Sequence, residues 1–262
     1  MVRLAHIEHP AQGSDGDPPL VVAHGLFGSG RNFNTLGRRW AAHRRVLLLD
    51  MRNHGASPWD DDMAYPAQAA DLADAVERLA GGRAVVLGHS MGGKAAMALA
   101  RTRPELVAGL IVADIAPMAY RHTHMAYVQA MLAVDLDRVR RRSDADPLLA
   151  DGVPDPMLRA FLLQNLRVED GAARWRINLA AIEREMPALT DWPGAWPHAR
   201  FDGPALFLHG SASDYVPPES RETIARAFPA AEIDGLEGAG HWLHAEKPAE
   251  FAARVDGWLA RQ

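Results

Sequence analysis

The sequence predicts an α/β protein in which a mostly parallel, twisted sheet is covered by helices on both faces. Short apolar runs rich in β-forming residues alternate along the chain with segments of helical period. The runs are almost continuously apolar, which is typical of parallel strands buried on both faces. The length of 262 residues fits one large domain with room for an inserted subdomain.

Six apolar runs are predicted to be strands. They cover residues 20–24, 45–50, 84–90, 109–114, 205–210 and 231–241. Between the second and third runs, the segment YPAQAADLADAVERLAGG places its apolar residues on one face, begins with Pro66 after its tyrosine and closes on two glycines. The last segment, KPAEFAARVDGWLARQ, has the same helical period. We therefore expect helices to separate the strands and to pack on the sheet.

One interval interrupts this alternation. Residues 118–191 contain no convincing strand, and three segments of helical period lie there, separated by Pro and Gly. A run of helices between two strands is typical of a lid over the strand ends. We therefore expect residues 118–191 to form a helical cap, inserted after strand 6, on a core made of residues 1–117 and 192–262.

Composition excludes several classes of function. The chain has 28 basic and 33 acidic residues and a formal net charge of -5, so it has no global basic field to attract nucleic acid. It has no cysteine, which excludes disulfides, thiolate metal sites and a cysteine nucleophile. No apolar run reaches the length of a signal peptide at the start, or the roughly 20 residues of a membrane span later. We expect a cytoplasmic protein with no nucleic-acid partner and no stable membrane association, and the oligomeric state stays open.

The stretch VVLGHSMGGKAAMALA places a serine between glycines where a buried strand turns into a helix. Residues 88–92 match the pattern Gly-x-Ser-x-Gly in the strand-to-helix setting that a nucleophile elbow requires. Such a sharp turn strains the serine backbone, and side chains at Gly88 and Gly92 would collide with it. The helix that follows points its positive N-terminus at the reacting centre. We therefore predict that Ser90 is a nucleophile.

A serine needs a general base at neutral pH. Of the 12 histidines, His241 lies directly after the last predicted strand and before the last helix. From that position it can reach the edge of the sheet where Ser90 lies. His241 is the predicted base, and His244 is the second choice.

The oxyanion that forms in acyl transfer needs two backbone N–H donors. The N–H of Met91, the residue after the nucleophile, is the first. The loop HGLFG follows the strand at residues 20–24, and its glycines allow its N–H groups to converge. We predict that Leu26 supplies the second donor, with Phe27 as the alternative.

Five motifs together resemble a known family. In chain order they are HGLFGS, DMRNHGASPW, GHSMGGKAAM, VADIAP and GAGHWLHAEKP. They resemble the α/β-hydrolase superfamily and, more narrowly, the bacterial carboxylesterase YbfF group, from about Leu20 to the C-terminus. The sequence RNHG at residues 52–55 replaces the Arg-Gly-x-Gly that is usual in the superfamily and indicates the narrower group. The resemblance implies the α/β-hydrolase fold, hydrolysis of carboxylic esters, a Ser-His-Asp triad, and no cofactor or metal.

The acid of the triad has two candidates. Most α/β hydrolases carry it after the seventh strand, in a Gly-x-x-Asp-x-x-Val pattern, but here Ser213 holds that position and Asp214 follows one residue late. Asp114 ends the strand after the nucleophile helix, where the narrower group is expected to place its acid. We favour Asp114, because a strand end positions a side chain better than a loop and an adjacent strand reaches the same edge. Asp214 is the alternative.

These residues predict a serine esterase of the carboxylesterase type that acts on small to medium acyl esters through an acyl-enzyme. The alternatives are the same triad acting on a thioester, an amide, a perhydrolysis reaction or a carbon–carbon bond, and a binding protein that keeps the fold without turnover. The predicted pocket residues are His24, Phe27, His89 and Trp242. His122 and His124, at the start of the cap, are further candidates for its lining.

Overall fold

The computed structural model describes residues 1–13, 17–194, 196 and 200–262 of the chain. Within this part, seven strands form one sheet in the order β1-β3-β2-β4-β5-β8-β9. Only the edge strand β1 runs antiparallel to its neighbour, β3, and the other pairs are parallel. The bounds are β1 His6–His9, β2 Leu20–Ala23, β3 Val46–Leu49, β4 Ala84–His89, β5 Val107–Ala113, β8 Ala205–Gly210 and β9 Ala231–Leu236. The predicted α/β-hydrolase fold, with a mostly parallel sheet, is confirmed.

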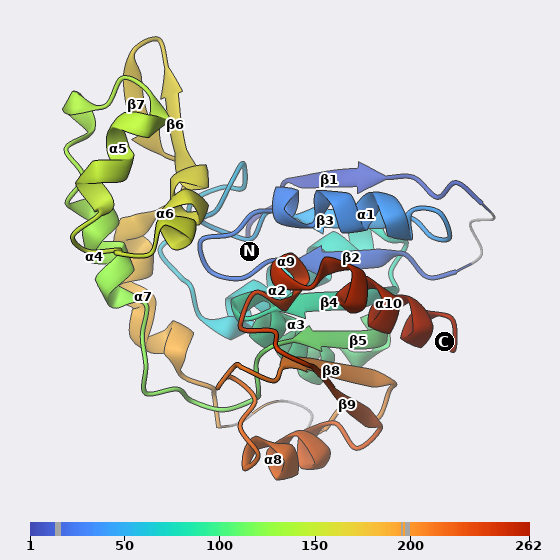
Figure 1. The fold of residues 1–262 in the computed structure, drawn as a ribbon. Helices are drawn as coiled ribbons and strands as arrows, with labels where there is room; N and C mark the ends of the chain where they lie inside the picture. Colours follow the sequence, from blue (N-terminus) through green and yellow to red (C-terminus); the bar gives the residue numbers. More distant parts are fainter. Residues whose placement is uncertain (14–16, 195, 197–199) are drawn as a thin grey trace.

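Helices cover both faces of the sheet because its strands present apolar side chains on both sides. The bounds of the helices outside the insertion are α1 Asn34–Trp40, α2 Tyr65–Leu79, α3 Met91–Thr102, α8 Ser220–Ala227, α9 Leu243–Glu246 and α10 Pro248–Leu259. Side chains of α1, α9 and α10 share one buried apolar cluster with one face of the strands. Those of α2, α3 and α8 share a second cluster with the other face. Figure 1 shows α10 and α3 separated by the sheet.

The insertion lies at one end of the sheet, on the left in Figure 1. It follows β5, the fifth strand in chain order, rather than a sixth strand. Its elements are α4 Met125–Leu132, α5 Arg142–Leu149, α6 Pro156–Leu162, β6 Leu166–Glu169, β7 Ala172–Trp175 and α7 Leu179–Thr190. Short 3-10 turns lie at Gly30–Phe33 and Pro104–Leu106 in the core and at Leu136–Arg138 and Leu163–Asn165 in the insertion.

Two expectations about strands were wrong, and one strand was not expected. The insertion is not purely helical, because β6 and β7 form an antiparallel hairpin. Its two loop residues, Asp170 and Gly171, both have positive φ, at 50° and 78°, and Asp-Gly is a hairpin signal that helical periodicity does not detect. The strand β1 was not predicted, because its His-Ile-Glu-His sequence has a single apolar residue, as suits a half-exposed edge strand. The last predicted strand, 231–241, ends at Leu236.

Among the described residues, no helix is both long and apolar enough to span a membrane.

Candidate active site

Ser90 occupies the turn between β4 and α3. Its φ of 51° lies in the left-handed region that a non-glycine residue rarely adopts. A Cβ atom at Gly88 would lie 2.2 Å from the Gly92 carbonyl oxygen, and one at Gly92 would lie 2.4 Å from the Ala23 carbonyl oxygen. The flanking glycines are therefore required for the turn, as the sequence predicted. The turn leaves the Ser90 side chain at the N-terminus of α3.

His241 lies next to this serine. It follows β9, and its Nε2 atom is 3.0 Å from Ser90 Oγ. The imidazole stacks on the Tyr215 ring at a centroid distance of 3.9 Å. The ring Nε2–H of His89 donates to the main-chain carbonyl of His241 over 2.9 Å. Side chain and main chain of His241 are therefore both held.

Asp114 extends this series of hydrogen bonds. Its Oδ2 atom is 2.7 Å from His241 Nδ1 and also accepts from the Ser213 hydroxyl over 2.5 Å. Its Oδ1 atom accepts from the Gly210 N–H over 2.9 Å. The carboxylate is completely buried, and these donors satisfy both oxygens.

Asp214, the alternative acid, is exposed, and Asp114 is the carboxylate that bonds to the His241 ring. The sequence places Asp214 one residue after the usual position of the acid, and this offset has a structural consequence. Ser213, which holds the usual acid position, turns its hydroxyl to Asp114. The loop after β8 thus supports the carboxylate of β5 instead of supplying one.

The two predicted oxyanion donors are available. In the described part of the chain, neither the Leu26 N–H nor the Met91 N–H has a hydrogen-bond acceptor. The N–H of Phe27, the predicted alternative, donates to His54 Nε2 over 3.3 Å. This geometry favours Leu26 over Phe27.

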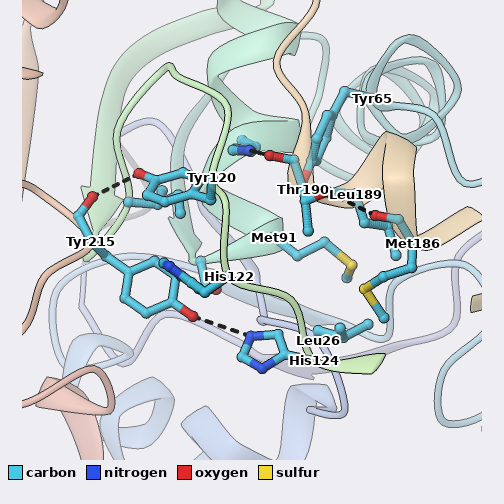
Figure 2. Close-up of a pocket in the computed structure, with 13 residues that line it drawn as sticks. Leu26, Tyr65, Met91, Tyr120, His122, His124, Met186, Leu189, Thr190 and Tyr215 are labelled. Atoms are coloured by element: carbon cyan, nitrogen blue, oxygen red, sulfur yellow. Dashed lines mark hydrogen bonds between the residues drawn. The ribbon is translucent and has the colours of Figure 1, made fainter. Parts of the chain in front are cut away.

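Ser90 opens into a cavity of about 400 Å³, a volume that includes its mouth. Residues from the core and the insertion line it (Figure 2): Leu26, Tyr65, Ser90, Met91, Lys94, Ile115, Tyr120, His122, His124, Met186, Leu189, Thr190 and Tyr215. Both histidines predicted at the start of the insertion are among them. The Tyr215 hydroxyl lies 3.2 Å from His124 Nε2, and the Tyr120 hydroxyl donates to the Tyr215 carbonyl. Burial lowers the pKa of His124 to about 4, so the His124 ring is uncharged at neutral pH.

Lys94 places an amino group in the same wall, one helical turn after Ser90. Its side chain is buried, and Nζ donates to the carbonyls of Thr190 and Asp191 over 3.1 and 2.8 Å. The amino group also lies 4.7 Å from the centre of the Tyr120 ring. Desolvation lowers its pKa to about 7. Lys94 thereby ties α3 of the core to the end of α7 in the insertion.

The four predicted pocket residues, His24, Phe27, His89 and Trp242, lie outside the cavity that contains Ser90. His24, His89 and Trp242 line a smaller cavity together. The two histidines support main chain instead, since the His24 ring bonds to backbone groups of residues 25 and 51 and the His89 ring to that of residue 241. Phe27 borders a separate cavity beside Arg31, and Trp242 borders a groove beside Phe161.

Five polar residues of the lining were not predicted from the sequence: Tyr65, Lys94, Tyr120, Thr190 and Tyr215. For Lys94 a signal was present, because residues four apart on a helix share a face and Lys94 is four residues after Ser90. The three tyrosines come from α2, the start of the insertion and the loop after β8, so only the tertiary fold brings them together.

Comparison with known proteins places this geometry in a family. A model of the alpha/beta hydrolase family matches residues 20–254. The chain is 42% identical over 247 residues to the sn-1-specific diacylglycerol lipase ABHD11 of Xenopus laevis, covering 91% of this chain and 78% of that protein. It is 37% identical to esterase YbfF of Escherichia coli (strain K12), covering 95% and 96%. A solved structure described as a marine microorganism esterase superimposes with a TM-score of 0.93 at 35% identity, covering 98% and 100%. The chain therefore belongs to the alpha/beta hydrolase family.

Proposed function

We propose that this protein is a serine hydrolase that cleaves carboxylic esters of small to medium acyl chain through an acyl-enzyme intermediate. The observation that carries the proposal is the continuous series of contacts from Ser90 Oγ to His241 Nε2 and from His241 Nδ1 to Asp114 Oδ2, at 3.0 and 2.7 Å. A nucleophile, a base and a buried acid in this order form the arrangement used for acyl transfer. The esterase and lipase names of the relatives support the same class of reaction.

In the first half of the proposed reaction, Ser90 Oγ bonds to the ester carbonyl carbon while its proton passes to His241 Nε2. The carbonyl oxygen gains the electron pair of the C=O double bond and accepts hydrogen bonds from the N–H groups of Leu26 and Met91. Each such donor contributes about 3 to 4 kcal/mol to stabilising the transition state. The ester C–O bond then breaks, and the alcohol leaves with the proton from His241.

In the second half, water attacks the acyl-serine and gives a proton to His241. The new tetrahedral species uses the same two N–H donors. It collapses to the carboxylic acid, and the proton on His241 returns to Ser90 Oγ. Throughout, Asp114 keeps the proton-bearing Nδ1 of His241 facing the carboxylate and stabilises the charged imidazole.

The nature of the acyl group and the role of the insertion are proposed from the lining of the cavity. Apolar side chains such as Leu26, Ile115 and Leu189 lie beside Ser90, which supports binding of the apolar chain of an acyl group. Met186, Leu189 and Thr190 of α7 form part of its wall. We therefore propose that residues 118–191 act as a cap that limits the chain length and excludes water from the site.

A series of p-nitrophenyl esters with rising acyl length tests the function. The wild-type protein should hydrolyse the short and medium members, and Ser90→Ala should lower kcat by about 10⁴-fold or more. A burst of nitrophenol equal to the enzyme concentration would indicate the acyl-enzyme. Equal rates for the wild type and Ser90→Ala, or no turnover of any ester, would refute the proposal.

A further inference from the structure

Phe27, directly after the proposed donor Leu26, has a strained backbone. Its φ is 64°, in the left-handed region, although it is a buried non-glycine residue. For such a residue this conformation costs of the order of 1 to 2 kcal/mol. Surrounding contacts must therefore hold Phe27 in place.

His54 holds the N–H of Phe27. The Nδ1 atom of His54 lies 2.8 Å from the Arg52 carbonyl, which can only accept, so Nδ1 carries the ring proton. Nε2 is then the free acceptor, and it receives the Phe27 N–H. Burial lowers the pKa of His54 to about 3, so the ring remains neutral and can accept. His54 belongs to the RNHG motif, and the proposed reaction leaves this residue without a role.

Asn165 holds the other polar group of Phe27. It lies in the insertion, in the turn just before β6, and only 5% of its surface is exposed. Its Nδ2 donates to the Phe27 carbonyl over 2.8 Å and to the Leu162 carbonyl over 3.2 Å. The N–H of Phe27 is thus held by the core and its carbonyl by the insertion.

The peptide that carries the Leu26 N–H is oriented by a further histidine. His24 Nε2 accepts the Met51 N–H over 2.9 Å, so the proton of His24 is on Nδ1, which donates to the Gly25 carbonyl over 2.8 Å. In a planar trans peptide the C=O and N–H point in opposite directions. Fixing the Gly25 carbonyl therefore directs the Leu26 N–H, provided that the next residue, Phe27, keeps its conformation.

We propose that His54 and Asn165 are positioning residues of this site: by holding the two polar groups of the Phe27 backbone, they keep the Leu26 N–H aimed at the oxyanion. The inference rests on the function proposed above. It makes the geometry of the oxyanion site depend on contact with the insertion. The insertion is then part of the catalytic apparatus through Asn165 as well as a wall of the cavity.

The test replaces each holding group by an apolar one of similar size, in the variants His54→Leu and Asn165→Leu. Each should lower kcat for a p-nitrophenyl ester by about 10- to 100-fold, below the loss of about 100- to 1,000-fold known for complete removal of an oxyanion donor. KM should stay within about 3-fold, because the N–H acts on the transition state. The inhibition constant of a trifluoromethyl ketone, which forms a tetrahedral adduct with the serine, should rise in parallel with the loss of kcat.

Two further variants separate positioning from a merely structural role. His54→Gln can present a side-chain oxygen near the place of Nε2 and should restore part of kcat. Asn178→Ala is the matched control in the insertion. Asn178 bonds to Asn53 Oδ1 over 3.1 Å and to the Ala181 N–H, but not to Phe27. It should lower the melting temperature and leave kcat within about 2-fold, because its lost bonds contribute stability alone.

The outcomes are distinguishable. Wild-type kcat and inhibitor affinity in folded His54→Leu and Asn165→Leu would overturn the inference while leaving the ester hydrolase intact. An equal loss of kcat in Asn178→Ala would also overturn it. Should Asn165→Leu fail to fold, Asn165→Ser, whose shorter side chain cannot reach the Phe27 carbonyl, has the same expected result. Absence of ester hydrolysis in the wild type would instead refute the proposed function.

Discussion

Replacing Asp114 by asparagine tests the assignment of the acid, and the structure predicts the size of the effect. The carboxylate accepts from Gly210, Ser213 and His241, whereas an amide has only one acceptor oxygen. If that oxygen takes the Oδ1 position and receives the Gly210 N–H, the NH₂ group faces His241 Nδ1. Nδ1 must then be the acceptor, and the ring proton moves to Nε2. A protonated Nε2 cannot take the proton of Ser90.

The opposite orientation of the amide is disfavoured. It would direct the NH₂ group at the Gly210 N–H in a fully buried place, and leaving one donor there without an acceptor costs about 1 to 3 kcal/mol. The amide therefore selects the wrong tautomer of His241. This defect lowers kcat by about 10⁴-fold in enzymes with such a triad, equivalent to about 5 kcal/mol in the activation barrier.

The assay is steady-state hydrolysis of a p-nitrophenyl ester, with circular dichroism to establish that each variant is folded. Asp214→Asn is the matched control, because Asp214 is exposed and has no bond to the His241 ring. It should retain kcat within about 2-fold, as expected for a surface substitution. A collapse of kcat in Asp214→Asn with near wild-type activity in Asp114→Asn would refute the reasoning.

Two predictions concern stability and pH. The pKa of Lys94 is lowered to about 7, so above pH 7 the unfolded chain holds a proton that the folded chain has lost, and the unfolding free energy rises with pH. Relative to Lys94→Met, urea unfolding should show a gain of about 2 kcal/mol for the wild type between pH 7 and 9, and parallel pH dependences would contradict this. Burial lowers the pKa values of His54, His124 and His244 to about 3, 4 and 3. Below about pH 6.5 the unfolded chain therefore binds more protons than the folded chain, and the unfolding free energy falls by up to about 4 kcal/mol for each pH unit of acidification. His244→Phe removes one of these protons and should reduce the slope of unfolding free energy against pH by about 1.4 kcal/mol per pH unit. An unchanged slope would contradict a buried, neutral His244.

Much of the site could be predicted because parallel strands bring distant residues to one edge. Ser90 and Asp114 follow β4 and β5, which pair in parallel, so their side chains emerge side by side. His241 comes to the same edge from the end of β9. The fold itself followed from apolar runs whose buried strands admit few other arrangements. The geometry agrees with the choice of Asp114, and the paired asparagine variants test its role.

The residues that could not be predicted support the site through tertiary hydrogen bonds, which local sequence patterns do not encode. His24 begins the HGLFG loop and His89 directly precedes Ser90 in its motif, and both were predicted to line the pocket. Their rings instead bond to main-chain groups, because buried backbone N–H and C=O groups need partners. Proximity to a motif along the chain does not reveal to which side a ring turns. Lys94 differs from these histidines, because its position on the predicted helix, four residues after Ser90, was a usable signal.

Hydrogen-bonded contacts join the insertion to the core. Lys94 donates to the main chain at the end of α7, Asn165 donates to the Phe27 carbonyl, and Asn178 donates to Asn53. All three contacts are polar and join residues more than 90 positions apart in the sequence. The local hydrophobic pattern therefore cannot predict them. They join the insertion to the nucleophile helix, to the donor loop and to the RNHG loop of the core. An insertion attached by apolar contacts could slide over these segments, whereas directional hydrogen bonds hold it in one register. A substitution that repacks the insertion without breaking these bonds should therefore change the preferred acyl length, while one that breaks the bond to Phe27 should change kcat.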